Sequence, residues 1–265
     1  MTERLYKHDP LTPGEREELE DDLIAFCDRE LDLLGNMHGL HVLYAGGSSL
    51  LWIEGLSQRI GAGGSVTAID IDVERVNDRQ ASLGEAELAA PVRLLTGDVF
   101  GMPFGLRTFD LVYSSGLFHE LDVKERGAED ALAVLHGVTR HGGKVATSDF
   151  VDSEPAVQLE EERLDAELRR EAYARKPYGI GLPERLVALH EKLLTDVRWL
   201  VSPPRRIRHL GKLVLAEDEP AELALLPPAT ARRLSESRDA VRGRILDEGY
   251  TRPATLYVEG LVQDA

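Results

Sequence analysis

The stretch HVLYAGGSSLLWIEGLSQRIGAGGSVTAIDID, residues 41–72, decides the fold of this chain. It contains a short apolar run, a turn of small residues, a segment with helical spacing, a second glycine-rich turn and an apolar run that ends in acid. This order predicts a β-α-β unit. The same alternation continues to about residue 150. We therefore expect an α/β, Rossmann-like fold with a mostly parallel sheet and helices on both faces.

The first turn has the composition of a nucleotide site. Gly46, Gly47, Ser48 and Ser49 are small enough to let a ligand approach the backbone, and the following helix offers unpaired N–H groups. Asp70 ends the second strand at the same edge of the sheet, where its carboxylate can accept hydrogen bonds from two ribose hydroxyls. Any parallel α/β protein also has tight turns and acids at strand ends. The stretch alone therefore leaves both interpretations open.

Composition restricts the class of protein. The chain has 265 residues, of which 43% are hydrophobic and 29% charged, as in a globular protein with one main core. No apolar run reaches the roughly 18 residues of a membrane span, and the first ten residues lack a signal-peptide pattern, so we expect a cytoplasmic protein without a membrane partner. The net charge of −16 disfavours binding to nucleic acid. The single Cys27 excludes an internal disulfide, and no metal site is expected, because His38 and His41 lack a second ligand pair.

Hydrophobic spacing and turn signals predict the elements and their grouping. The expected helices are 12–34, 50–60, 73–83, 129–139, 155–176, 183–200 and 230–249, and the expected strands are 42–45, 65–71, 92–95, 109–114, 144–149 and 253–262. A turn is expected at 141–143, and 207–226 has no clear pattern. The expected domain organisation is an N-terminal helical segment (1–40), a Rossmann-like core (41–150), a helical insertion or cap (151–228), and a closing helix and strand of the core (229–265).

Six blocks of sequence carry a family resemblance. They are VLYAGGSSL at 42–50, GAGG at 61–64, AID at 68–70, GDVFGMPF at 97–104, FDLVYSSGLFHE at 109–120 and TRHGGKV at 139–145. In this order and spacing the chain resembles the class I S-adenosylmethionine (SAM)-dependent methyltransferases, and most closely their ubiquinone and menaquinone C-methyltransferase branch. The resemblance covers residues 41–149 and implies a seven-strand-type sheet with a helical C-terminal elaboration.

The resemblance also implies roles for single residues. Gly46, Gly47 and Ser48 would contact the methionine moiety of SAM, and Asp70 would hold its ribose. The remaining implied positions are Ile71 on the adenine face, Asp98 and the Val99 backbone N–H at the adenine amino group, and Ser114 and Ser115 beside the point of transfer. Asp98 has an alternative interpretation as the cap of a turn, and the two serines as a plain strand end.

Three positions depart from the family pattern. Tyr44 stands where the family has an acid that orients the loop and the methionine amino group, and its phenol cannot supply that negative charge. Ser48 and Leu50 occupy the places of glycines, where Ser48 adds bulk and Leu50 is expected to narrow the pocket. These departures keep open a changed cofactor position, weak binding, or loss of methyl transfer.

The predicted function is SAM-dependent methyl transfer to a small-molecule acceptor. The alternative hypothesis is a catalytically inactive or repurposed methyltransferase-like binding or scaffold protein; a nicotinamide-dependent oxidoreductase is disfavoured because GGSSL does not supply G-x-G-x-x-G. His119 follows the fourth strand and is the candidate general base, with a histidine that caps its loop as the alternative. A homo-oligomer is compatible with the sequence. The acceptor itself is not predicted.

The acceptor pocket is expected from segments outside the core. The aromatic candidates are Tyr6, Phe26, Tyr173, Tyr178 and Trp199. Residues 178–181 have the composition of either a lid hinge or a plain turn between helices. The basic cluster Arg205, Arg206, Arg208 and Lys212 is interpreted as solvated surface rather than as a site for an acidic substrate.

Overall fold

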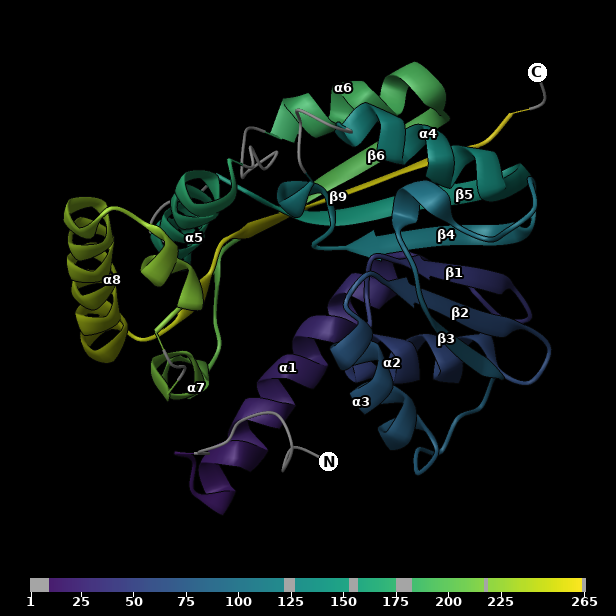
Figure 1. The fold of residues 1–265 in the computed structure, drawn as a ribbon. Coiled ribbons are helices and arrows are strands. Elements are labelled where there is room, and N and C mark those ends of the chain that lie inside the picture. Colours follow the sequence, from purple (N-terminus) through teal and green to yellow (C-terminus); the bar gives the residue numbers. More distant parts are fainter. Residues whose placement is uncertain (1–9, 122–126, 153–156, 175–182, 217–218, 264–265) are drawn as a thin grey trace.

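The computed structural model describes residues 10–121, 127–152, 157–174, 183–216 and 219–263. Its centre is a seven-stranded sheet with the order β3-β2-β1-β4-β5-β9-β6 (Figure 1). The neighbouring pairs from β3 to β5 are parallel, and β9 runs antiparallel to both of its neighbours. A separate two-stranded sheet pairs β7 with β8. The prediction of an α/β, mostly parallel sheet is therefore confirmed.

The elements follow one another along the chain as strands alternating with helices, first in the core and then in the C-terminal part. The core elements are α1 (Pro13–Leu33), β1 (His41–Ala45), α2 (Leu50–Ile60), β2 (Ser65–Asp70), α3 (Val73–Leu83), β3 (Val92–Thr96), β4 (Phe109–Ser115), α4 (Ala128–Val138) and β5 (Thr139–Val151). The later elements are α5 (Val157–Tyr173), α6 (Pro183–Leu193), β6 (Thr195–Ser202), β7 (Arg205–Arg206), α7 (Leu210–Ala216), α8 (Pro228–Glu248), β8 (Thr251–Arg252) and β9 (Ala254–Leu261). Single 3-10 turns are η1 (Val99–Gly101), η2 (Phe118–Glu120) and η3 (Ala221–Leu225).

Two apolar layers cover the two faces of the sheet. Helices α4 and α6 pack on one face, and α1, α2 and α3 lie on the other (Figure 1). Strand residues alternate between these layers, so that Leu43 and Val112 pack toward α4 while Val42 and Leu111 pack toward α1 and α2. Cys27 of α1 lies buried in the second layer, as a small hydrophobic residue would.

Helix α1 begins as the sequence predicts. The Thr12 hydroxyl accepts a hydrogen bond from the Glu15 N–H, and the Glu15 carboxylate accepts one from the Thr12 N–H, which is a complete capping box. Pro13 occupies the first helical position, where its missing N–H costs nothing. The helix then runs beneath the sheet and packs against α2.

Two predicted boundaries are wrong. The helix expected over 183–200 ends at Leu193, and residues 195–202 form β6 at the edge of the sheet. β-Branched and aromatic side chains recur here with the period of two that favours a strand, at Thr195, Val197, Trp199 and Val201. The prediction was too long because the leucines before residue 195 continue the helical spacing.

The turn expected at 141–143 lies inside β5. Thr139 pairs with Phe109, and the next pair is Lys144 with Leu111, so the residues between them form a bulge opposite Asp110. Gly142 has a φ of +71°, and a Cβ at Gly143 would lie 2.8 Å from the Asp110 carbonyl oxygen. The glycines therefore permit a bulge that keeps the chain in the sheet.

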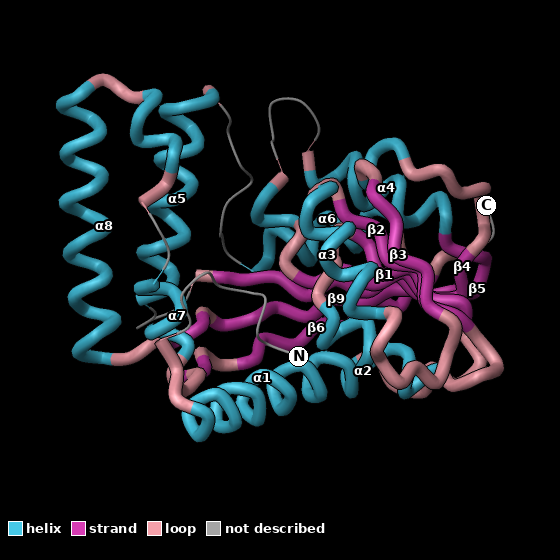
Figure 2. Tube along the Cα trace, turned by 60° about the horizontal axis from the view of Figure 1, so that its bottom comes forward, coloured by secondary structure: helices cyan, strands magenta, loops and turns pink. Residues whose placement is uncertain are grey.

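Helices α5, α7 and α8 lie together at one end of the sheet (Figure 2). Helix α8 packs against α5 through Leu234 and Leu168, and against α7 through Ile245. Within the 151–228 segment, α6 and β6 instead return to the main sheet. Among the described helices none combines the length and apolar character of a membrane span.

Candidate active site

A cavity of about 570 Å³ lies at the carboxyl ends of β1, β2, β3 and β4. The parallel register brings these ends to one edge, with Tyr44 of β1 beside Tyr113 of β4 and Ala45 beside Ile69 of β2. The cavity is lined by every residue predicted to contact the cofactor except Ser114, namely Tyr44, Gly46, Gly47, Ser48, Asp70, Ile71, Asp98, Val99 and Ser115.

Close packing explains the two glycines of the first turn. Gly46 has a φ of +73°, and a Cβ there would lie 2.6 Å from Leu117 Cδ1. A Cβ at Gly47 would lie 2.3 Å from Cζ of Tyr44. The amides of both glycines donate to the Ile69 carbonyl at 2.9 and 3.0 Å, which ties the turn to β2. These two amides are therefore engaged by the protein, contrary to the expectation that a ligand would reach them.

Tyr44 fills the space below this turn. Its ring is buried and stacks on Tyr113 with 5.8 Å between the ring centroids. Burial and the nearby Glu30 raise the pKa of the Tyr44 phenol above its ordinary value, so the group stays neutral. Tyr44 thus supplies bulk and a hydroxyl at the position of the family's acid, and no charge.

The side chain of Ser48 supports Asp70. Its Oγ donates to Asp70 Oδ2 at 2.7 Å, and the Asp72 N–H donates to Asp70 Oδ1 at 3.0 Å. The carboxylate is therefore fixed at the end of β2, with lone pairs left for ribose hydroxyls. The predicted narrowing by Leu50 is not found, because Leu50 is buried at the start of α2 and does not line the cavity.

Two further positions match the shape of a nucleoside site. Ile71 is 71% exposed although it is apolar, and it lines the cavity, where a flat ligand would cover it. Asp98 caps η1 by accepting from the Phe100 N–H at 3.0 Å, and it also lines the cavity with Val99. The two interpretations of Asp98 from the sequence, turn cap and cavity residue, are therefore compatible.

Ser114 and Ser115 lie on opposite faces of β4, because successive strand residues alternate. Ser115 lines the cavity and donates to Glu30 Oε2 at 3.2 Å. Ser114 is fully buried and lines none of the cavities identified in the described part of the chain. It is the one predicted cofactor residue that lies outside the site.

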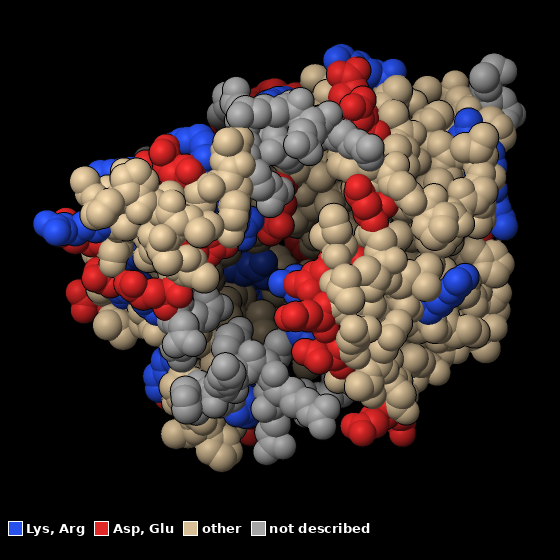
Figure 3. Space-filling view, viewed as in Figure 1, with Lys and Arg blue, Asp and Glu red and all other residues tan. Residues whose placement is uncertain are grey.

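A second cavity of about 340 Å³ adjoins the first. The two cavities share the lining residues Tyr44, Ser49, Ser115, Gly116 and Glu120. The second cavity is completed by α1, β5, α5 and β8, which contribute Phe26, Glu30, Ser148, Asp149, Phe150, Gln158, Glu162 and Arg252. Figure 3 shows the molecule hollowed on this side, with basic atoms deep in the hollow and acidic atoms along its wall.

His119 lies in this second cavity and is held by Asp149. Its Nδ1 is 2.7 Å from Asp149 Oδ1, while Asp149 Oδ2 accepts from the Phe118 N–H at 2.6 Å. Burial disfavours the charged ring, but the adjacent Asp149 carboxylate outweighs this effect and raises the pKa of His119 to about 9. The imidazole ring of His119 is largely enclosed, whereas the neighbouring Glu120 side chain is mostly exposed.

Two buried glutamates face the same cavity. Glu30 of α1 accepts from the Tyr113 hydroxyl and from Ser115, yet burial raises its pKa above the ordinary value. Burial also raises the pKa of Glu162 of α5, partly opposed by His119. Both carboxyl groups are thereby shifted toward the neutral form.

The sequence analysis named few residues of the second cavity. Of its aromatic candidates, Phe26 lines the cavity, Tyr173 and Trp199 are about half exposed and do not line it, and Tyr6 and Tyr178 lie outside the described residues. The expected hinge at 178–181 also lies outside them. Asp149 ends the strand expected at 144–149, a signal that was present but not used. Arg252 and Glu162 had no local signal.

Comparisons with known proteins bear on this core. Residues 42–143 match the family model described as a methyltransferase domain. Two solved structures similar to this chain are the YcgJ protein from Bacillus subtilis (TM-score 0.59, 13% identity, 91% of this chain and 100% of that one) and a SAM-dependent methyltransferase from Aquifex aeolicus (TM-score 0.53, 17% identity, 96% and 94%). A third is a geranyl diphosphate methyltransferase in complex with SAM (TM-score 0.54, 17% identity, 96% and 93%).

The stretch 42–143 is therefore similar to a methyltransferase domain, and the fold around it is the one seen in solved SAM-dependent methyltransferases. The residues at the first cavity fit that cofactor in kind. A carboxylate is fixed where ribose hydroxyls need an acceptor, an exposed apolar side chain stands where a base would lie, and glycines keep the turn close to β2.

Proposed function

We propose that this protein transfers the methyl group of SAM to a small-molecule acceptor. The observation that carries the proposal is the joining of two cavities at Tyr44 and Ser115, one with the residues of a nucleoside site and one with a histidine and an arginine. SAM supplies a methyl group on a positively charged sulfur, from which a nucleophile displaces it in line. The protein then has to hold the cofactor, orient the acceptor and accept a proton.

The first cavity holds the cofactor in this proposal. Asp70 accepts from the ribose hydroxyls, while Ser48 and the Asp72 N–H keep its carboxylate in place. Asp98 and the Val99 N–H bind the adenine edge, and Ile71 packs on the adenine face. Tyr44 and Ser115 line both cavities, so they would lie between the cofactor and the acceptor.

His119 is the proposed general base for an oxygen or nitrogen acceptor. With SAM bound, the acceptor would take its methyl group and release a proton, and Nε2 of His119 would accept that proton. Asp149 holds Nδ1 and fixes the direction of the ring. Since the pKa of His119 is raised to about 9, the neutral ring that accepts the proton becomes common only at alkaline pH.

The finer parts of the proposal rest on the sequence. The resemblance to the ubiquinone and menaquinone C-methyltransferase branch, the cytoplasmic location and the division into core and cap stay predictions. In this division α5 and α7 belong to a cap that closes the acceptor cavity, because α5 contributes Gln158 and Glu162 to its wall.

Calorimetric titration with SAM and with S-adenosylhomocysteine tests the proposal. We expect micromolar binding of both by the wild-type protein. The Asp70→Asn variant should bind at least about tenfold more weakly, since it loses a charged acceptor for two hydroxyls, a difference of about 1.4 kcal/mol or more. Asp78→Asn removes the same charge from the exposed face of α3 and should bind as the wild type does.

Two results would count against the proposal. Equal binding by the Asp70 and Asp78 variants would remove the ribose assignment. The absence of detectable binding of either ligand by the wild type would reject methyl transfer and favour the alternative of a repurposed, non-catalytic protein.

A further inference from the structure

Arg252 occupies an unusual position in the wall of the second cavity. It ends β8, and its guanidinium carbon lies 4.5 Å from the ring centroid of Phe26 and 5.1 Å from that of Phe150. The two rings come from α1 and β5, and the cation lies over both of them. The geometry thus fixes where the guanidinium lies without using its hydrogen-bond donors.

Within the described part of the chain, those donors have no hydrogen-bond partner. Nε of Arg252 is fully enclosed and makes no hydrogen bond, and no carboxylate oxygen of the described residues lies within 4 Å of its nitrogens. A buried donor left in this state is costly, and for a charged group the cost is larger. Gln158 Oε1, which belongs to the same cavity wall, is likewise buried without a partner. These orphaned groups indicate a ligand that supplies the missing contacts.

Among the described residues no carboxylate of the cavity forms an ion pair with the guanidinium, although the nearby Glu30 favours its charged form. His119 is paired with Asp149, so their charges cancel. Glu30 and Glu162 are both shifted toward the neutral form by burial. Burial lowers the pKa of Arg252 too, but a guanidinium remains charged in proteins. The cavity therefore presents one fixed cation with free donors.

The wall around this cation is largely aromatic. Phe26, Phe150, Trp52 and Tyr44 all line the cavity, with Phe26 and Trp52 in edge-to-face contact at 5.9 Å. Planar ligands pack well against such walls. The cation lies on β8, and the two cavities join at Tyr44 and Ser115. A ligand held at one end by Arg252 therefore has its other end free to reach this junction.

We propose that the second cavity binds an acceptor that carries a carboxylate on an aromatic body, with Arg252 as the residue that recognises the carboxylate. This inference rests on the proposed function, since it names the substrate class of the same site. The carboxylate takes two N–H donors of the guanidinium, and the aromatic body packs among Phe26, Trp52 and Tyr44. The nucleophilic atom then points to the junction beside His119.

Binding of three small probes of similar shape tests the inference. Benzoate, benzamide and benzylamine are titrated calorimetrically into the full-length protein, once with and once without saturating S-adenosylhomocysteine. We expect benzoate to bind at least about tenfold more tightly than benzamide in both conditions. Arg252→Gln should abolish that preference. Arg252→Lys, which keeps the charge but not the planar fork, should retain only part of it.

A matched variant separates this effect from a change in overall charge. Arg163→Gln removes an exposed arginine of α5 that pairs with Asp152 and does not line the cavity, and it should keep the benzoate preference. Circular dichroism of each variant checks that the fold is retained.

The outcomes are decisive in either direction. A benzoate preference that disappears in Arg252→Gln supports the inference. Equal affinity for benzoate and benzamide, stronger binding of benzylamine, no binding of benzoate at tens of millimolar, or an unchanged preference in Arg252→Gln overturns it. Because S-adenosylhomocysteine binding is measured in its own titration, failure of the proposed function is seen separately from failure of the carboxylate assignment.

Discussion

At the scale of single residues, the aromatic ring of Tyr44 requires a glycine at position 47. The aromatic ring takes the space below the first turn, and the turn passes over it only because residue 47 lacks a Cβ. Ser48 is explained in the same way, because its hydroxyl supports Asp70 instead of crowding the ligand. The departures from the family motif thus belong to one local arrangement that keeps the cofactor-side carboxylate and the cavity.

This arrangement predicts that Gly47→Ala destabilises the fold. The added methyl group would lie 2.3 Å from Cζ of a ring packed against Tyr113, so the ring or the turn has to move. We expect the free energy of unfolding in urea to fall by about 1–3 kcal/mol. Gly101→Ala is the control, because a Cβ there meets nothing within 4 Å. Equal stability of the two variants would contradict the steric explanation.

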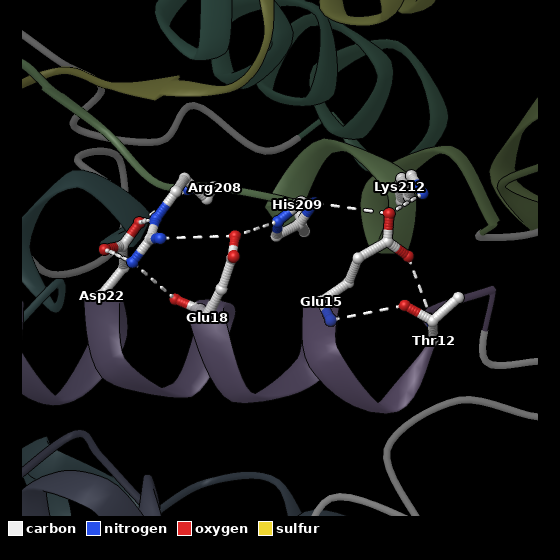
Figure 4. A network of polar contacts seen from close by, with 7 residues as sticks. All are labelled: Thr12, Glu15, Glu18, Asp22, Arg208, His209 and Lys212. Atoms are coloured by element: carbon white, nitrogen blue, oxygen red, sulfur yellow. Dashed lines mark hydrogen bonds and ion pairs between the residues drawn. The ribbon is translucent and has the colours of Figure 1, made fainter.

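At the scale of elements, α1 joins the core to the C-terminal helices through ion pairs (Figure 4). Arg208 binds Asp22 by two nitrogens at 2.9 and 3.1 Å, and its backbone N–H donates to the same carboxylate at 2.8 Å. His209 and Lys212 contact Glu18 and Glu15 on the preceding turns of the helix. Arg208 and Lys212 are exposed, as the interpretation of this basic cluster as surface predicts, and both also pair with carboxylates of α1.

The contact predicts a local effect of Asp22→Asn. Hydrogen bonds from Arg208 lower the pKa of Asp22, as expected for a carboxylate bound in its charged form. Loss of that charge should make α7 open more easily, with amide hydrogen exchange over 210–216 faster by about fivefold, equivalent to about 1 kcal/mol. The neighbouring Asp21→Asn makes the same change in charge on the exposed face and should leave this exchange unchanged. Equal exchange in both variants would show that Asp22 does not hold α7.

At the scale of the whole molecule, a buried neutral histidine connects α6 to the sheet. His190 Nδ1 lies 2.8 Å from the Leu186 carbonyl oxygen, and Nε2 lies 3.1 Å from the Thr147 hydroxyl of β5. Burial lowers the pKa of His190 to about 4, whereas an unfolded chain takes up the proton near pH 6.5. The folded state therefore loses stability as the pH falls from about 6.5 to about 4.

The expected size of this acid effect is about 3 kcal/mol, from a difference of roughly 2.5 pKa units. Urea unfolding gives the free energy of unfolding of the wild type and of His190→Gln at pH 7 and at pH 4. The acid effect is the change in the difference between the two proteins. The advantage of the wild type over the variant should shrink by that amount at the lower pH. His38→Gln, on the exposed surface, should show the same pH dependence as the wild type. If the stability difference between wild type and His190→Gln were the same at both pH values, burial of the neutral ring would not cost the folded state stability in acid.

Local sequence determined the elements and the cofactor side of the site. Strands β1, β2 and β4 end where small and acidic residues follow apolar runs, and parallel register brings all such ends to one edge. A rule that acts along the chain therefore indicated Gly46 and Asp70 without any distant contact, and the family resemblance added Asp98. It failed for Ser114, because alternation along β4, set by pairing with its neighbours, decides which serine faces the cavity.

Only the tertiary structure decided the second cavity. Phe26, His119, Gln158 and Arg252 come from four segments that are far apart in the chain, and no local spacing indicates that they meet. The reason is physical: α1 and the β8 turn are brought together by burial of apolar faces and by ion pairs such as Arg208 with Asp22, interactions in which sequence separation plays no part. The sequence by itself thus determined the class of fold and the cofactor edge, and the packing of α1, α5 and β8 decided what can lie beside it.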